Sequence, residues 1–160
     1  MNDLVAICRR PISELLPHRA PMILINEACG MAGDDFLAKV RITSSSPFFS
    51  DVGVPAWVGL EYMAQTVAAY SGAQGLADGG EITVGMLLGT RDYRAMVPCF
   101  SDGQELTIRA RIELIQDNGV SSMHCRIQDA EGLLLAQADI TVINVPDLRG
   151  FLVESDGNGI

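Results

Sequence analysis

The residue best placed to do chemistry in this sequence is Glu61, the one charged side chain between Asp51 and Asp78. Its neighbours at helical spacing are apolar and include Trp57 and Ala64. An ionised carboxylate is costly to bury among apolar groups unless it has a partner. Burial instead favours the protonated carboxyl, which can act as a general acid. Glu61 is therefore a catalytic candidate; the alternative is a solvent-facing glutamate on an incompletely buried helix.

A second polar residue, Gln65, lies four positions after Glu61 and therefore on the same face of a helix. Its amide can hydrogen-bond the carboxyl of Glu61 or the carbonyl oxygen of a substrate. An amide that caps a helix or lies in an interface would fit the same spacing. Gln65 is kept as a candidate substrate-binding residue, with the structural role as the alternative.

The chain has two histidines, and they stand in different settings. His18 lies in the segment LPHRAPM between two prolines, which restrict the backbone around it. A histidine is a competent base near neutral pH, so His18 is a second catalytic candidate, with a structural role as the alternative. His124 lies between Met123 and Cys125 on the polar face of an alternating strand, which predicts a surface residue.

The segment GVPAWVG places the start of a helix just before Glu61. Free N–H groups at such a start, here those of Ala56 and Trp57, can polarise a substrate carbonyl. Basic candidates for a phosphate-bearing partner are Arg91, Arg94 and Arg19, and single solvated charges are the alternative. The sequence has no phosphate-binding loop and neither a GxGxxG nor a GxSxG motif.

The hydrophobic pattern predicts the elements that must position these residues. From 55 to about 73 the chain is apolar all round, which indicates a buried central helix that ends at Gly72 or Gly75. A short helical turn is expected within 10–18, with Ser13 as a possible N-cap. Apolar or alternating runs predict strands at 22–25, 36–42, 83–93, 105–116, 121–129 and 133–145. The order predicts an α+β fold in which an antiparallel sheet wraps around one long helix.

Length and composition narrow the class of protein. The 160 residues, 48% of them apolar, predict one domain over 1–146 and a tail over 147–160. A net charge of −9 argues against nucleic acid and anionic membrane surfaces as partners. The four cysteines lack CxxC spacing, so no zinc site is expected. No segment is typical of a signal peptide or a membrane span, so we expect a cytoplasmic protein.

Three motifs resemble, in order and spacing, the (3R)-hydroxyacyl-acyl carrier protein dehydratases of the hotdog fold. They are LPHRAPMILINEACG, PFFSDVGVPAWVGLEYMAQ and RDYRAMVPCFSDGQEL. The resemblance covers about residues 16–145. In VPAWVGLEYMAQ and LLGTR the chain is similar to the divergent dehydratase subgroup of aryl polyene biosynthesis.

The resemblance implies a function and a set of partners. The fold would be a hotdog dimer, made with a second copy or with another hotdog subunit, with active sites and apolar acyl tunnels at the interface. The reaction would remove water from a 3-hydroxyacyl chain on acyl carrier protein, giving the trans-2-enoyl thioester in fatty acid or polyene biosynthesis. Glu61 and Gln65 fall on the family's helix Glu and Gln, and a helix N–H would polarise the thioester. No metal or redox cofactor is implied.

The sequence departs from the family at the expected base. The loop that carries the family's catalytic histidine is shortened here and contains no histidine, and Ala56 replaces a glycine at the helix start. Either His18 is the base, or a second hotdog subunit supplies a histidine, or the chain no longer catalyses dehydration. An acyl thioesterase that uses Glu61 is a further alternative. Because acyl carrier proteins are acidic, Arg91 and Arg94 are the expected contacts at the tunnel mouth.

Overall fold

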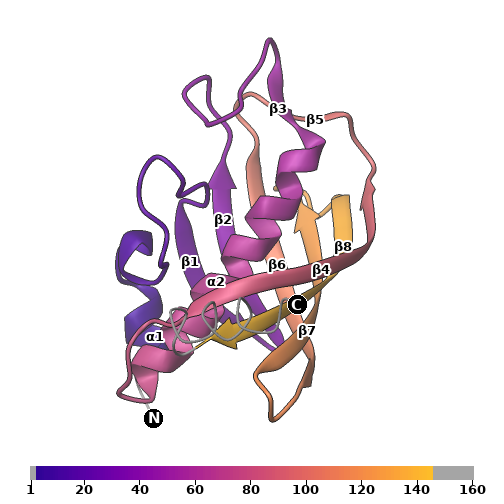
Figure 1. Cartoon of the computed structure of the whole chain (residues 1–160). Helices are drawn as coiled ribbons and strands as arrows, with labels where there is room; N and C mark the ends of the chain where they lie inside the picture. The colour runs from indigo at the N-terminus through magenta and orange to yellow at the C-terminus, as the bar shows by residue number, and fades with distance from the viewer. Residues whose placement is uncertain (1–2, 146–160) are drawn as a thin grey trace, which may run out of the picture.

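A long helix, α2 (Gly59–Ala77), lies in the curve of a six-stranded antiparallel sheet, and strand β4 crosses in front of it (Figure 1). The structure is a computed structural model that describes residues 3–145. In sheet order the strands are β1 (Glu27–Ala32), β2 (Asp35–Arg41), β6 (Glu105–Ile115), β7 (Val120–Gln128), β8 (Leu134–Val145) and β4 (Val84–Ala95). A small ribbon pairs β3 (Gly53–Pro55) with β5 (Cys99–Ser101). The predicted α+β hotdog fold is confirmed.

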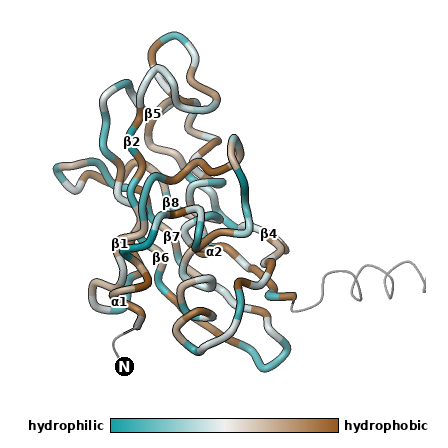
Figure 2. Tube along the Cα trace, turned by 90° about the vertical axis from the view of Figure 1, so that its left-hand side faces the viewer, coloured by the Kyte–Doolittle hydropathy of each residue, from teal (hydrophilic) through white to brown (hydrophobic). Residues whose placement is uncertain are grey.

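The sheet follows the alternation of the sequence. Residues of β7 alternate between buried and half-buried along the whole strand, and apolar residues recur at intervals along the coloured part of the trace in Figure 2. The inward face of β6 and β7 carries Ile108, Ala110, Cys125 and Ile127, all buried against α2. The predicted turn between these strands is confirmed, with Gly119 at a φ of 88° that suits glycine.

Helix α2 is buried on most sides, as its apolar sequence predicts, but it ends later than expected. It continues to Ala77 because Gly72 does not cap it. A Cβ at Gly72 would collide with the carbonyl oxygen of Leu15. The glycine therefore allows the segment before His18 to lie directly on the helix.

The strand predicted at 22–25 is wrong, since β1 begins at Glu27. The buried amide of Gln65 explains the difference. Its Oε1 accepts a hydrogen bond from the N–H of Leu24 at 2.8 Å, and its Nε2 donates to the carbonyl of Met22 at 2.8 Å. A side chain of α2 thus takes the backbone groups that a neighbouring strand would otherwise bond.

The N-terminal part contains a helix that the sequence pattern did not predict, α1 (Asp3–Cys8), which packs on α2. The predicted turn is a 3-10 helix, Ile12–Glu14, and its N-cap is Pro11 rather than Ser13. Within residues 3–145, none of the helices is long and apolar enough to cross a membrane. The predicted tail, 147–160, lies outside the described residues, and the domain boundary stays a prediction.

Candidate active site

His18 and Glu61 face one another although 43 positions separate them in the sequence. Nε2 of His18 lies 3.8 Å from Oε1 of Glu61. The side chains are 30% and 42% exposed, respectively. The carboxyl of Glu61 is therefore neither buried among apolar groups nor fully solvent-facing, because it lies at a cavity. An imidazole and a carboxyl at this separation can act together as base and acid.

Gln65 holds the carboxyl of Glu61 in place. Its Nε2 donates to Oε1 of Glu61 at 2.9 Å, as the spacing of four residues predicts. The same amide bonds Met22 and Leu24, so both hydrogens of Nε2 are used within the chain. Gln65 is therefore placed to orient Glu61 and to fasten the segment after His18, and it does not offer a free N–H to a substrate carbonyl.

Three features fix the loop that carries His18. Leu15 and Leu16 are fully buried just before it, and Gly72 of α2 lets their backbone approach closely. Arg19 folds back so that its guanidinium donates to the carbonyl of His18 at 2.8 Å and to that of Leu16 at 3.2 Å. Arg19, considered above as a phosphate contact, thus serves as a clamp of this loop.

A cavity of about 180 Å³ opens from the His18–Glu61 pair and runs along one side of α2. Apolar groups of α2, β4 and β8 form most of its wall, including Ala64, Leu87 and Val142. A pair of titratable groups at one end of a mostly apolar pocket is the usual layout of an active site for an apolar substrate.

Sequence comparison places this arrangement in a known family. The sequence model of the ApeP-like family, described as ApeP dehydratase, matches residues 10–153. The chain belongs to the ApeP-like dehydratase family. A relative named 3-hydroxyacyl-acyl-carrier-protein dehydratase FabZ, from Agrobacterium fabrum, is 29% identical over an alignment of 143 residues, which covers 85% of this chain and 88% of the relative.

One solved structure agrees with the ApeP-like assignment, and another shares the fold. One chain of the structure described as the dehydratase heterocomplex ApeI:P from Xenorhabdus doucetiae matches with a TM-score of 0.82 and 26% identity. The match covers 94% of this chain and 99% of the other. A hypothetical thioesterase with coenzyme A from Streptococcus pneumoniae matches with a TM-score of 0.59 at 15% identity, over 76% of this chain and 86% of its own, and shows the shared fold alone.

The start of α2 in this ApeP-like chain differs from expectation. The N–H of Ala56 donates to the carbonyl of Pro98 at 3.1 Å, so it is not free to polarise a substrate. Among the described backbone carbonyls none accepts from the N–H of Trp57, which remains an available donor one turn before Glu61. Neither Ala56 nor Trp57 is among the residues that line the described cavity. The Trp57 side chain is 64% exposed and packs edge-on against Phe48 with ring centroids 5.5 Å apart.

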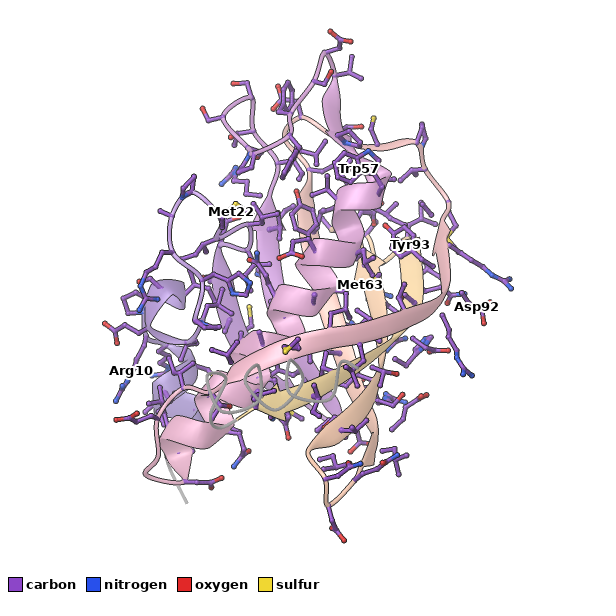
Figure 3. The ribbon with its side chains drawn as sticks, in the orientation of Figure 1. Arg10, Met22, Trp57, Met63, Asp92 and Tyr93 are labelled. Atoms are coloured by element: carbon purple, nitrogen blue, oxygen red, sulfur yellow. The ribbon has the colours of Figure 1, made fainter. Side chains whose placement is uncertain are left out.

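Sequence reasoning missed Tyr93, which lies beside the start of α2 (Figure 3). Its hydroxyl donates to the carbonyl of Ala56, and it fills the space that a side chain at Gly59 would need. Burial raises the pKa of Tyr93 to about 12, so it remains a neutral donor. Its place in the RDYR motif was the signal that could have identified it.

Neither predicted arginine of β4 lies at the cavity. Arg91 is exposed and does not line it, and Arg94 lies in a shallow hollow on the other face with His124 and Asp139. The substrate contact predicted for Arg91 is therefore not present in the described cavity. The bulge between Arg91 and Arg94 turns the neighbouring Asp92 outward in Figure 3.

One group of side chains has the donor types of a metal site. Donor atoms of Glu113, His124 and Asp139 lie within 4.8 Å of one another, on three neighbouring strands. Nδ1 of His124 lies 2.7 Å from Oδ1 of Asp139, which agrees with the polar, partly exposed face predicted for this histidine. None of the three lines the cavity, so this group is separate from the His18–Glu61 pair.

Proposed function

We propose that this chain removes water from a 3-hydroxyacyl chain carried on acyl carrier protein, with Glu61 as the general acid and His18 as the base. The observation that carries the proposal is the pairing of His18 and Glu61 across 3.8 Å at the end of an apolar cavity. The apolar wall suits an acyl chain. Membership of a dehydratase family and the similarity to the FabZ protein support the reaction class.

The two groups divide the chemistry of an elimination. Nε2 of neutral His18 takes the proton from C2, the electrons form the C2–C3 double bond, and the C3–O bond breaks. The carboxyl of Glu61 gives its proton to the departing hydroxyl, which leaves as water. The imidazolium then returns a proton to the Glu61 carboxylate, across a separation of 3.8 Å. Gln65 keeps the carboxyl oriented, and the N–H of Trp57 is the candidate donor to the thioester oxygen.

One observation favours a second candidate function, a subunit that contributes Glu61 while another hotdog chain supplies the base. Nδ1 of His18 is buried and has no hydrogen-bond partner within residues 3–145. An Nε2 that acts as a base requires the proton to lie on Nδ1, where burial without an acceptor costs about 1–3 kcal/mol. The tautomer with its proton on Nε2 also leaves Nδ1 without a partner, but it places an N–H toward Glu61 and has no lone pair on Nε2 to act as a base.

The edge of the sheet offers the surface that such a partner needs. Among the strands of residues 3–145, β4 pairs only with β8, and its stretch 84–90 has no charged residue. Val84, Leu87 and Leu88 on it are exposed at 36%, 45% and 53%. An uncharged, apolar edge strand is open to pairing with another sheet. The heterocomplex named for the similar ApeI:P structure supports a second hotdog chain as the occupant of this edge.

Mass spectrometry of a 3-hydroxyacyl-acyl carrier protein, incubated with the purified chain, tests both candidates. The chain is used alongside the variants Glu61→Gln and His18→Ala, with Gln74→Ala as a control on the exposed end of α2. We expect the carried chain to lose one water with the wild type and the control, and with neither active-site variant.

Other results of this experiment would distinguish the half-site role from the complete enzyme, or exclude both. Water loss that appears only after a second hotdog subunit is added, and that still requires Glu61, supports the half-site role. Full activity of Glu61→Gln in either setting would exclude both candidates. Release of free acid and carrier thiol in place of water would indicate a thioesterase.

A further inference from the structure

The cavity changes in character along its length. Glu61, Ala64, Ala68 and Ser71 line it in sequence order, about one per helical turn. Ten residues of helix advance about 15 Å, so the backbone positions of Glu61 and Ser71 lie about that far apart along the wall. An extended chain advances about 1.2 Å per bond, so on the order of twelve bonds span this distance.

Strand β4 runs antiparallel to α2, and one contact at each end of the helix shows in which direction the cavity wall runs. Tyr93 bonds the carbonyl of Ala56 at the start of the helix. The carbonyl of Glu81, just before the strand, lies 3.0 Å from the position of a Cβ on Gly75 near the end of the helix. The residues of β4 and its approach that line the cavity, from Leu87 back to Thr83, therefore follow the wall away from Tyr93 toward the helix end.

Three polar side chains line the cavity toward that far end. Ser71 comes from α2, Thr83 precedes β4, and Asn144 belongs to β8. Each is half-buried, and within residues 3–145 none of their side-chain groups makes a hydrogen bond to another residue. Asn144 stands opposite Gly85, whose missing side chain leaves the amide room on the cavity side.

These hydroxyl and amide groups are unfavourable neighbours for the methyl end of a plain hydrocarbon chain. Dehydrating hydroxyl and amide groups against a methyl group costs free energy, because no hydrogen bond replaces the water that leaves. A site whose polar groups are satisfied by a substrate hydroxyl discriminates against the analogue without it. The same three residues also border a neighbouring hollow lined by Gln74 and Ser121, so they mark the boundary of the apolar part.

We propose that Ser71, Thr83 and Asn144 form a subsite that binds a hydrogen-bonding group, such as a hydroxyl, at the far end of the acyl chain. This inference rests on the proposed function, because it takes the cavity to be the acyl site. The substrate class is then an acyl thioester whose chain is apolar between the thioester and a polar terminus. The amide and the two hydroxyls offer both donors and acceptors to that terminus.

Calorimetric titration with two unreactive analogues tests the subsite. Both are acyl-pantetheine amides of equal chain length, which cannot lose water; one ends in a methyl group and the other in a hydroxyl. We expect the wild-type chain to bind the hydroxyl-ended analogue at least about tenfold more tightly, the worth of one to two net hydrogen bonds. Ser71→Ala with Thr83→Val should reduce that ratio severalfold, and Asn144→Leu should do the same in a separate protein.

The matched control is Gln74→Ala, which lies in the neighbouring hollow and not in the cavity, and should keep the wild-type ratio. Unfolding midpoints of all variants identify any that do not fold. Equal binding of the two analogues by the wild type overturns the subsite while leaving the acyl cavity in place. If neither analogue binds, the cavity is not the acyl site and the proposed function fails with it. A ratio that survives in both sets of variants also overturns the assignment of these residues.

Discussion

Two carboxylates of this fold show how differently the same group can be held. Asp35 on β2 is 5% exposed and contacts three guanidiniums: Arg111 at 2.8 Å, Arg126 at 2.9 Å and Arg109 at 3.5 Å. Glu61 on α2 is 42% exposed and has one amide donor, with the imidazole of His18 at 3.8 Å. Asp35 lies on the outer face of the sheet, and Glu61 lies at the cavity.

The two carboxylates differ in whether an oxygen remains free to contact a ligand. Both oxygens of Asp35 are bonded to cations, so the group links β2 to β6 and β7 and has little capacity left for a ligand. In Glu61 the amide of Gln65 and the imidazole both approach Oε1, and no residue of the described chain bonds Oε2. A carboxyl that is oriented through one oxygen and open at the other can transfer a proton.

The largest predicted effects come from exchanging the two carboxyls for amides. Glu61→Gln should lower turnover at least 100-fold, the low end for loss of a general acid, and change the free energy of unfolding by less than about 1 kcal/mol. Asp35→Asn should keep turnover within about twofold and cost about 3 kcal/mol of stability. That figure is the low end for removing one partner of a buried ion pair, because the arginines are partly exposed.

Urea titrations and turnover assays on the same preparations provide both readouts. The comparison fails if Asp35→Asn abolishes turnover without loss of stability, since the buried carboxylate would then act in the reaction. It also fails if Glu61→Gln destabilises the chain by as much as Asp35→Asn does.

Gln65 should show the next largest effect, because it serves both the fold and the site. Gln65→Leu leaves the N–H of Leu24 and the carbonyl of Met22 without their partner, which should cost about 2 kcal/mol of unfolding free energy. It also frees the carboxyl of Glu61, so turnover should fall as well. Gln74→Leu is the control: within the described part of the chain its amide hydrogen-bonds only the exposed Asp78, and it should change both quantities little. A Gln65→Leu protein of wild-type stability would contradict the assigned role.

Residues within one segment were predictable from sequence, and contacts between segments were not. The isolation of Glu61 in an apolar helix and its spacing to Gln65 are local patterns. The structure agrees with the spacing, because the amide of Gln65 hydrogen-bonds the carboxyl of Glu61. The approach of His18 depends on Gly72 and on the clamp of Arg19, which no local pattern shows. Asp35 resembles an ordinary solvated charge in an alternating strand, because its three partners come from two other strands.

Contacts between distant segments also explain two wrong predictions, the free N–H of Ala56 and the strand at 22–25. The N–H of Ala56 appears free when only the helix start is considered, but Pro98 from the approach to β5 bonds it. Residues 22–25 have a strand-like composition, but the amide of Gln65 bonds their backbone. In both places a group distant in sequence satisfies a backbone atom, and such competition is invisible to hydrophobic periodicity.

A smaller effect should appear as a pH dependence that belongs to Asp35. Burial alone would raise the pKa of Asp35, but the hydrogen bonds and charges of Arg111, Arg126 and Arg109 outweigh it and lower the pKa below its ordinary 3.8. A carboxyl whose pKa is lower in the folded state contributes stability above its unfolded pKa and loses it as the pH falls through the folded pKa. The stability difference between wild type and Asp35→Asn should therefore be constant from pH 7 to 5 and shrink below about pH 4. Urea titrations across this range measure it, and a gap that widens toward low pH would contradict the lowered pKa.

The smallest predicted effect comes from a third carboxylate, which has a cation but no burial. Glu105 lies 3.4 Å from Nζ of Lys39, with both side chains about half exposed. Exposed ion pairs contribute little, because water screens the charges and ordering two long side chains costs entropy. Glu105→Gln should change the free energy of unfolding by less than about 0.5 kcal/mol and leave turnover unchanged. A urea titration at low and high salt checks this result against Asp35→Asn. Should Glu105→Gln prove as destabilising as Asp35→Asn, burial and the number of guanidinium partners would not be what separates a structural carboxylate from a surface one. If it is neutral, the three carboxylates differ in the way their surroundings predict: one is saturated and structural, one is open and reactive, and one is solvated.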